Sequence, residues 1–115
     1  WHNSNNYTED TYDFIKPLQN EYQDLTLVRG VVPDSLSEEF VNLSPSFLHI
    51  DMNIEHPERK ALEFFVPQMR AGSVILLDDY GFARHSKQRH SQDEFFRNLG
   101  KQPTHIPTGQ AFVIV

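Results

Sequence analysis

Three aspartates follow two short apolar stretches of this sequence, in places where carboxylates can do chemistry. Asp51 ends the apolar part of residues 46–53, and Asp78 and Asp79 come directly after residues 73–77. Neighbouring parallel strands lie about 4.8 Å apart, and ligands of open α/β sheets bind at their carboxyl ends. Because clustered carboxylates repel each other unless a cation lies among them, and because Mg²⁺ prefers oxygen ligands, the pattern predicts a metal or catalytic site.

A second interpretation of the aspartates stays open at this point. Aspartates that follow a strand commonly accept hydrogen bonds from the backbone of the next turn. In that case Asp51, Asp78 and Asp79 are caps, and their replacement by asparagine would change stability but not ion affinity.

Histidines near the aspartates are the other titratable candidates. His85 and His90 follow the acidic pair closely, and a histidine there could act as a general base near neutral pH. His90 is equally typical of a solvated helix face. His49 alternates with apolar residues inside a strand pattern, so we expect it to be a hydrogen-bonded core residue.

The elements that must position these residues are short and alternate in type. Helical patterns cover residues 7–22, with Thr8 as N-cap and Pro17 as a kink or end, and residues 34–40, 56–69 and 86–99. Strand patterns cover 25–33, 46–53, 73–77 and two segments around residues 108–109, the last being 110–115. This order predicts an α/β fold with a mostly parallel sheet and a C-terminal antiparallel strand pair.

Composition limits the classes of function. The 115 residues are 38% hydrophobic, which predicts one folded domain over residues 1–115. A net charge of −6 without a basic block argues against nucleic-acid binding. No apolar segment approaches the roughly 20 residues that span a bilayer, so we expect no membrane association. The absence of cysteine excludes disulfides and suits a reducing compartment, so we expect a cytoplasmic protein.

Three motifs give the sequence a family resemblance. The segments HIDMN (49–53), GSVILLDDYG (72–81) and PTGQAFVIV (107–115) occur in the order and spacing of class I S-adenosylmethionine-dependent methyltransferases. The sequence most resembles the macrocin O-methyltransferase-like group. The resemblance implies a partial Rossmann-like sheet with helices on both faces, in which 25–30, 46–51 and 73–78 are the third, fourth and fifth strands.

The resemblance also implies roles for individual residues. Asp51, Asp78 and Asp79 match the positions that hold Mg²⁺ beside the hydroxyl of a small-molecule acceptor in metal-dependent relatives. Asp51 would also take part in catalysis and border the S-adenosylmethionine cofactor, and His85 would be the catalytic base. Gly30 would lie near the adenine of the cofactor.

The sequence departs from the family in its cofactor motif. No Gly-x-Gly occurs in the chain, so we expect a truncated domain that corresponds to the C-terminal half of a methyltransferase. Loss of central strands would expose apolar strand edges, which predicts that residues 25–30 pair with 46–51 or that two chains join as a homo-oligomer. The alternative functions are a catalytically inactive, oligomerising α/β remnant and a binding module.

Overall fold

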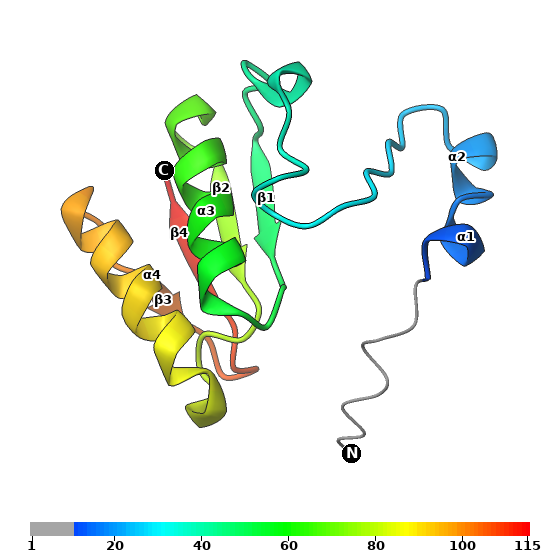
Figure 1. The fold of residues 1–115 in the computed structure, drawn as a ribbon. Helices are drawn as coiled ribbons and strands as arrows, with labels where there is room; N and C mark the ends of the chain where they lie inside the picture. Colours follow the sequence, from blue (N-terminus) through cyan, green and yellow to red (C-terminus); the bar gives the residue numbers. More distant parts are fainter. Residues whose placement is uncertain (1–10) are drawn as a thin grey trace. The chain divides into compact units, whose positions relative to one another are not determined.

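A computed structural model describes residues 11–115 of the chain (Figure 1). The chain separates into two compact units, whose described parts are residues 11–30 and 31–115, and each is described by itself. The expectation of one domain over residues 1–115 stays a prediction.

The described part of the first unit contains two one-turn helices, α1 (Tyr12–Ile15) and α2 (Leu18–Glu21). The predicted helix over 7–22 is therefore divided, and Pro17 takes the N-cap position of α2, where its missing N–H does no harm. The predicted N-cap Thr8 lies outside the described residues.

The predicted strand over 25–33 does not form, and its pairing with residues 46–51 is therefore wrong. These residues are irregular, although the Gln19 side-chain oxygen accepts a 2.8 Å hydrogen bond from the Leu27 amide. Valine and threonine favour a strand only where a neighbouring strand pairs with their backbone groups. Pro33 cannot donate such a bond at all.

The second unit contains a four-stranded mixed sheet. Its strands are β1 (Phe47–Ile50), β2 (Val74–Leu77), β3 (Thr104–His105) and β4 (Ala111–Ile114), and their order is β1-β2-β4-β3. β1 and β2 are parallel, whereas β4 is antiparallel to both β2 and β3. This arrangement confirms an α/β fold with a C-terminal antiparallel pair, although only one of the three pairings is parallel.

Two longer helices complete this unit, α3 (Glu55–Phe65) and α4 (Ser86–Asn98). They match the predicted helices 56–69 and 86–99, except that α3 gives way to a short 3-10 helix at Val66–Gln68. Pro67 explains this change because it has no N–H for the α-helical bond to residue 63. Further 3-10 turns lie at Glu38–Phe40, within predicted helix 34–40, and at Ala83–His85.

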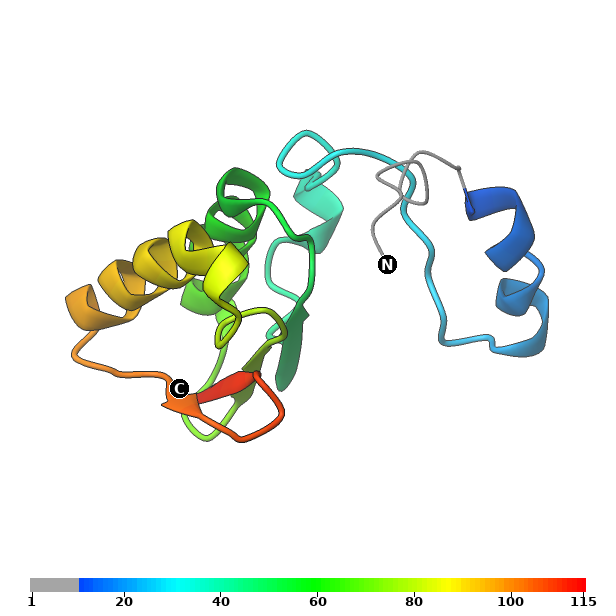
Figure 2. The same cartoon turned by 90° about the horizontal axis from the view of Figure 1, so that it is seen from below.

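Both long helices pack on one face of the sheet (Figures 1 and 2). The side chains of Ile75 and Leu77 point to this face and are fully buried. On the opposite face Phe47 and Ile114 remain 57% and 56% exposed. Successive side chains of a strand point to opposite faces of the sheet, and neither α3 nor α4 lies on this second face. The expectation of helices on both faces is therefore not met within residues 31–115.

None of the helices in residues 11–115 combines the length and apolar character that crossing a membrane requires.

Candidate functional site

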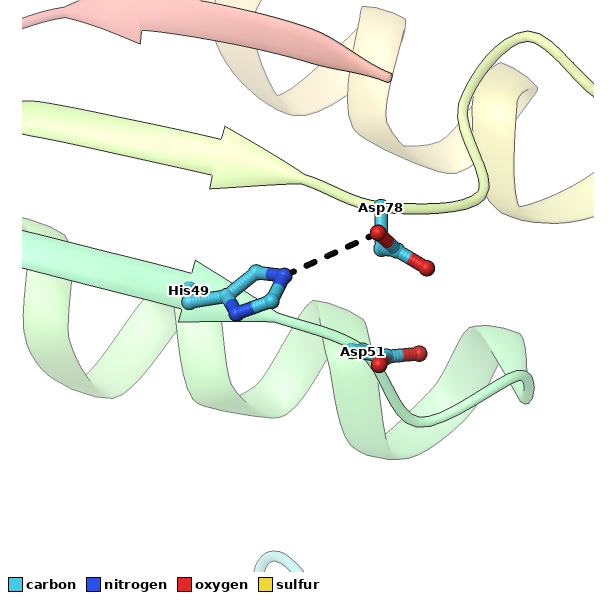
Figure 3. Close-up of side chains that lie close together, drawn as sticks. All are labelled: His49, Asp51 and Asp78. Carbon is cyan, nitrogen blue, oxygen red and sulfur yellow. Dashed lines mark ion pairs between the residues drawn. The ribbon is translucent and has the colours of Figure 1, made fainter. Parts of the chain in front are cut away.

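The carboxyl ends of the parallel strands β1 and β2 bring three potential ligands together. His49 lies on β1, Asp51 follows its last residue, and Asp78 follows the last residue of β2. The Asp78 amide donates a 3.0 Å hydrogen bond to the Ile50 carbonyl, which extends the strand pairing to the start of the loop. One ligand atom from each of the three side chains lies within 4.8 Å of the others (Figure 3). We call His49, Asp51 and Asp78 the rim triad.

The rim triad is open to solvent, and one further side chain, Gln110, forms a hydrogen bond with one of its members. His49 Nε2 lies 3.8 Å from Asp78 Oδ1, and their side chains are 43% and 31% exposed. The Gln110 amide donates a 2.7 Å hydrogen bond to the same Asp78 oxygen. Two carboxylates and an imidazole form a donor set that fits a divalent cation, and solvent access leaves positions for water or a substrate hydroxyl.

Asp79 does not belong to this group, although it is adjacent to Asp78. The pairing of Ile50 with Leu77 places Asp51 opposite Asp78 when the register is continued by one residue. Because consecutive side chains alternate between faces, Asp78 shares the open face with His49 and Asp51, whereas Asp79 turns toward the helices. Asp79 is 8% exposed. The structure thus brings together two of the three predicted metal ligands.

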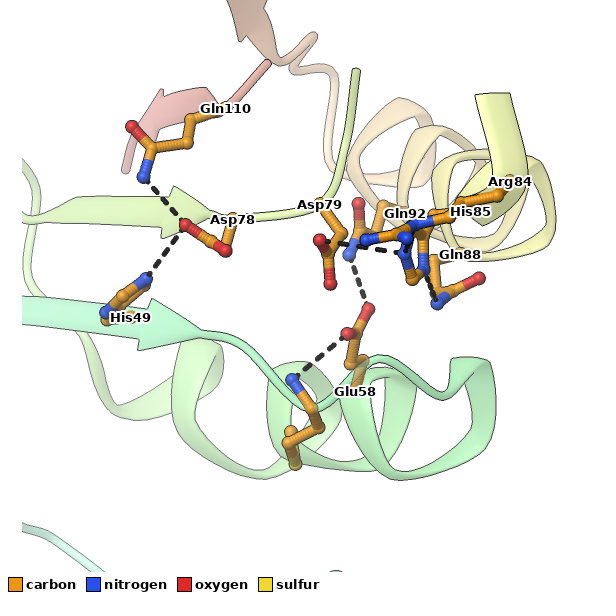
Figure 4. A network of polar contacts seen from close by, with 10 residues as sticks. His49, Glu58, Asp78, Asp79, Arg84, His85, Gln88, Gln92 and Gln110 are labelled. Carbon is orange, nitrogen blue, oxygen red and sulfur yellow. Dashed lines mark hydrogen bonds and ion pairs between the residues drawn. The ribbon is translucent and has the colours of Figure 1, made fainter. Parts of the chain in front are cut away.

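Asp79 instead faces a second polar group inside the protein (Figure 4). Its Oδ1 lies 3.7 Å from His85 Nε2, which also accepts a 2.9 Å hydrogen bond from Arg84 Nε. The Gln88 side-chain amide lies 2.7 Å from His85 Nδ1. Both ring nitrogens of His85 therefore have protein partners, and His85 faces Asp79 rather than the rim triad.

Glu58 on α3 completes this buried cluster, which consists of Glu58, Asp79, His85, Gln88 and Gln92. Glu58 is 2% exposed and accepts hydrogen bonds from the Gln92 amide at 2.8 Å and the Met52 backbone N–H at 3.3 Å. Asp79 Oδ2 and Gln92 Oε1 are buried and have no donor among the described residues.

Burial controls the ionisation of both carboxyl groups. Desolvation raises the pKa of Glu58 to about 7, despite the opposing Met52 hydrogen bond, and the nearby Asp79 charge adds to the increase. Desolvation likewise raises the pKa of Asp79 above its ordinary value, against the lowering effect of His85. Near neutral pH this cluster therefore holds a proton more readily than solvent-exposed carboxylates do.

Sequence reasoning missed Glu58, Gln88 and Gln92, although their spacing contained a signal. Glu58 stands four residues before Leu62, and Gln92 stands four residues before Phe96. Positions four apart share a helix face, and Leu62 and Phe96 are fully buried. A polar residue on the apolar stripe of each helix thus marked the buried cluster.

Two other expectations concern His49 and Gly30. His49 is exposed on the open face of the sheet, so the expectation of a packed core histidine is wrong. The strand expected to end at Gly30 is absent, and Gly30 belongs to the first unit, so its place near the adenine stays a prediction.

Comparisons with known proteins add no relative to this description. No family model matches the chain, no curated protein matches it, and no solved structure matches it. The resemblance to methyltransferases therefore stays a prediction that depends on the three sequence motifs.

Proposed function

We propose that this chain binds a divalent cation at the rim triad, as the metal-binding part of a Mg²⁺-assisted, S-adenosylmethionine-dependent methyltransferase with a Rossmann-like sheet. The acceptor would be a hydroxyl group of a small molecule. One observation carries the proposal: His49, Asp51 and Asp78 converge at the carboxyl ends of two adjacent parallel strands.

The residues of the rim triad suit this chemistry. A bound divalent cation would lower the pKa of a coordinated hydroxyl and so favour the oxyanion that attacks a sulfonium methyl group. Asp51 and Asp78 supply the oxygen ligands that Mg²⁺ prefers, and the His49 imidazole extends the choice to ions such as Zn²⁺ or Fe²⁺. Gln110 fixes the orientation of the Asp78 carboxylate.

The other features expected from the resemblance give the proposal less support. The predicted C-terminal strand pair is present as β3 and β4, which agrees with the resemblance. The sequence contains no Gly-x-Gly turn, both ring nitrogens of His85 have partners in the buried cluster, and Gly30 belongs to the first unit. The proposal therefore depends on Asp51 and Asp78, and its cofactor part needs a separate test.

The first test is a calorimetric titration with Mg²⁺ and with Mn²⁺. We expect saturable binding that Asp78→Asn weakens by at least about ten-fold, since even residues that support a metal ligand change affinity by that much. Asp34→Asn is the matched control because Asp34 is exposed and lies outside the rim triad. Equal binding by both variants would make the aspartates caps and would contradict the metal site.

The second test titrates S-adenosylhomocysteine with and without the cation. Saturable binding supports the methyltransferase part of the proposal and justifies a search for hydroxyl acceptors. Cation binding without any cofactor binding leaves the metal site standing and removes the methyltransferase function from this chain.

One observation favours a second function, that of an oligomerising α/β binding module. The face of the sheet opposite α3 and α4 carries a row of apolar side chains, Phe47, Val74 and Ile114, which the strand register places side by side. Two of them are more than half exposed. We propose that a second copy of the chain covers this face.

A further inference from the structure

Three positively charged side chains of this acidic protein line one cavity of the second unit. A cavity of about 310 Å³ lies between α4 and residues 101–103, and its lining includes Arg89, Asp93, Arg97 and Lys101. We call it the basic pocket. Its three cations and one carboxylate leave a net charge of two positive units, whereas the whole chain has a net charge of −6.

Helix α4 aligns most of these side chains. Arg89, Asp93 and Arg97 are spaced four residues apart, so they form one row along the helix surface. Lys101 joins them because the chain turns at Gly100, whose φ of 69° lies in the left-handed region that glycine favours. The Gln102 side chain adds a neutral amide to the lining.

One end of the row is already neutralised. Arg89 Nε lies 3.9 Å from an Asp93 carboxylate oxygen, and its guanidinium stacks 4.9 Å from the centre of the Tyr80 ring. The Tyr80 hydroxyl donates a 2.5 Å hydrogen bond to Asp93. Burial raises the pKa of Tyr80, so this donor keeps its proton. Asp93 and Tyr80 therefore fix Arg89 in place.

The other end of the row keeps unused donors. Within residues 11–115 the Arg97 guanidinium has no hydrogen-bond or ion-pair partner. Lys101 Nζ donates to the Ile114 carbonyl at 3.0 Å, and an ammonium group has two further donors. Arginine and lysine together offer a bidentate fork and a compact charge, the combination that binds phosphate oxygens well.

We propose that the basic pocket binds a phosphate dianion, either free or as the phosphate group of a small phosphomonoester, between Arg97 and Lys101 and next to Arg89. The charge of the ligand matches the surplus charge of the pocket. None of these residues belongs to the rim triad, so this site is independent of the proposed metal function.

The test is a titration of the ¹⁵N-labelled full chain with inorganic phosphate at constant ionic strength, followed through the Arg97 Nε–H signal and neighbouring amides. Constant ionic strength matters because exposed charges are screened within about 10 Å at 0.1 M salt. We expect saturable shifts in the pocket, and a roughly ten-fold weaker affinity in Arg97→Gln, since a charge-assisted hydrogen bond is lost.

Arg70→Gln is the matched control, because it removes the same charge from an exposed arginine outside the pocket. It should leave phosphate affinity unchanged. Arg97→Lys keeps the charge but loses the fork, so we expect an intermediate affinity. Thermal unfolding of each variant verifies that the fold is intact, which the lack of partners for Arg97 predicts.

Two further ligands identify what is recognised. Phenyl phosphate that binds at least as tightly as inorganic phosphate supports a phosphomonoester as ligand, and tighter binding of free phosphate supports the free ion. Malonate that binds more tightly than either would overturn the assignment to phosphate. Linear, unsaturated shifts, or equal losses in Arg97→Gln and Arg70→Gln, would overturn the site itself.

Discussion

Glu58 gives the stability of the protein a pH dependence that can be measured. Its pKa is about 7 in the folded protein because of burial, against an ordinary value of 4.5. The folded state therefore binds a proton at Glu58 more tightly than the unfolded chain does. The contribution of this proton to the free energy of unfolding is fully present below about pH 4.5 and is lost as the pH rises through 7. We expect the free energy of unfolding to fall by roughly 3 kcal/mol across this range, before other groups are counted.

Chemical denaturation between pH 5 and 8, with chelator present, measures this slope. Glu58→Gln should flatten it, because a glutamine side chain does not titrate in this range. A half-turn of the Gln92 amide would bring the unpaired Gln92 oxygen toward the new amide group and keep the pair hydrogen-bonded. Asp79 contributes in the same direction, since burial raises its pKa too. Glu55→Gln, at an exposed position of the same helix, should keep the slope. A wild-type stability that is flat or rises over this range would contradict the buried proton.

Among the elements, the loop after β2 is held against the turn between β3 and β4 at Gly81. The Gly81 amide donates a 2.7 Å hydrogen bond to the Gly109 carbonyl. A Cβ at Gly81 would lie 2.8 Å from that same oxygen and would collide with the His105 ring. The ring can rotate away, but the backbone oxygen cannot move without loosening the turn.

Gly81→Ala should therefore destabilise the protein by about 1–3 kcal/mol, the usual cost of forcing atoms into a packed site. It should also weaken cation binding, because Gln110, which orients Asp78, follows Gly109 directly. Gly100→Ala is a useful comparison. Open space surrounds that position, so only its positive φ opposes the change. If Gly100→Ala lowered the free energy of unfolding more than Gly81→Ala, the predicted clash of Gly81→Ala with the Gly109 carbonyl would be contradicted.

The sequence predicted those elements whose partners are specified by their own pattern. The apolar stripes of α3 and α4 and the apolar runs of β1, β2 and β4 were each found within a few residues, because burial of one face requires that spacing. The prediction of a strand over 25–33 was wrong because β-branched residues indicate a tendency to pair but not whether a partner strand exists. Sheet order and the uncovered face depend on contacts distant in sequence.

The candidate site was predictable to the same extent. The ends of β1 and β2 were located correctly, and Asp51 and Asp78 lie directly after them, as predicted. Strand alternation, applied one residue further, would have separated Asp79 from Asp78 and placed His49 with the exposed carboxylates. The pKa of Glu58 was not predictable, because it depends on packing of α3 against α4.

At the scale of the whole molecule, the uncovered sheet face predicts self-association. Phe47, Val74 and Ile114 form a row across β1, β2 and β4, and among residues 11–115 the edge strand β1 has a neighbour on one side only. Exposed apolar rows next to an open strand edge favour contact with another chain. The net charge of −6 opposes such contact, so added salt should strengthen it by screening the repulsion.

Sedimentation velocity between about 5 and 500 µM, at low and moderate salt, tests this prediction. We expect a reversible shift toward dimer with concentration, which Phe47→Lys abolishes because it places a charge in the apolar row. Leu99→Lys is the matched control: Leu99 is also about half exposed, at 49%, but it ends α4 on the helix layer. A monodisperse monomer throughout, or equal effects of the two substitutions, would exclude the sheet face as the interface.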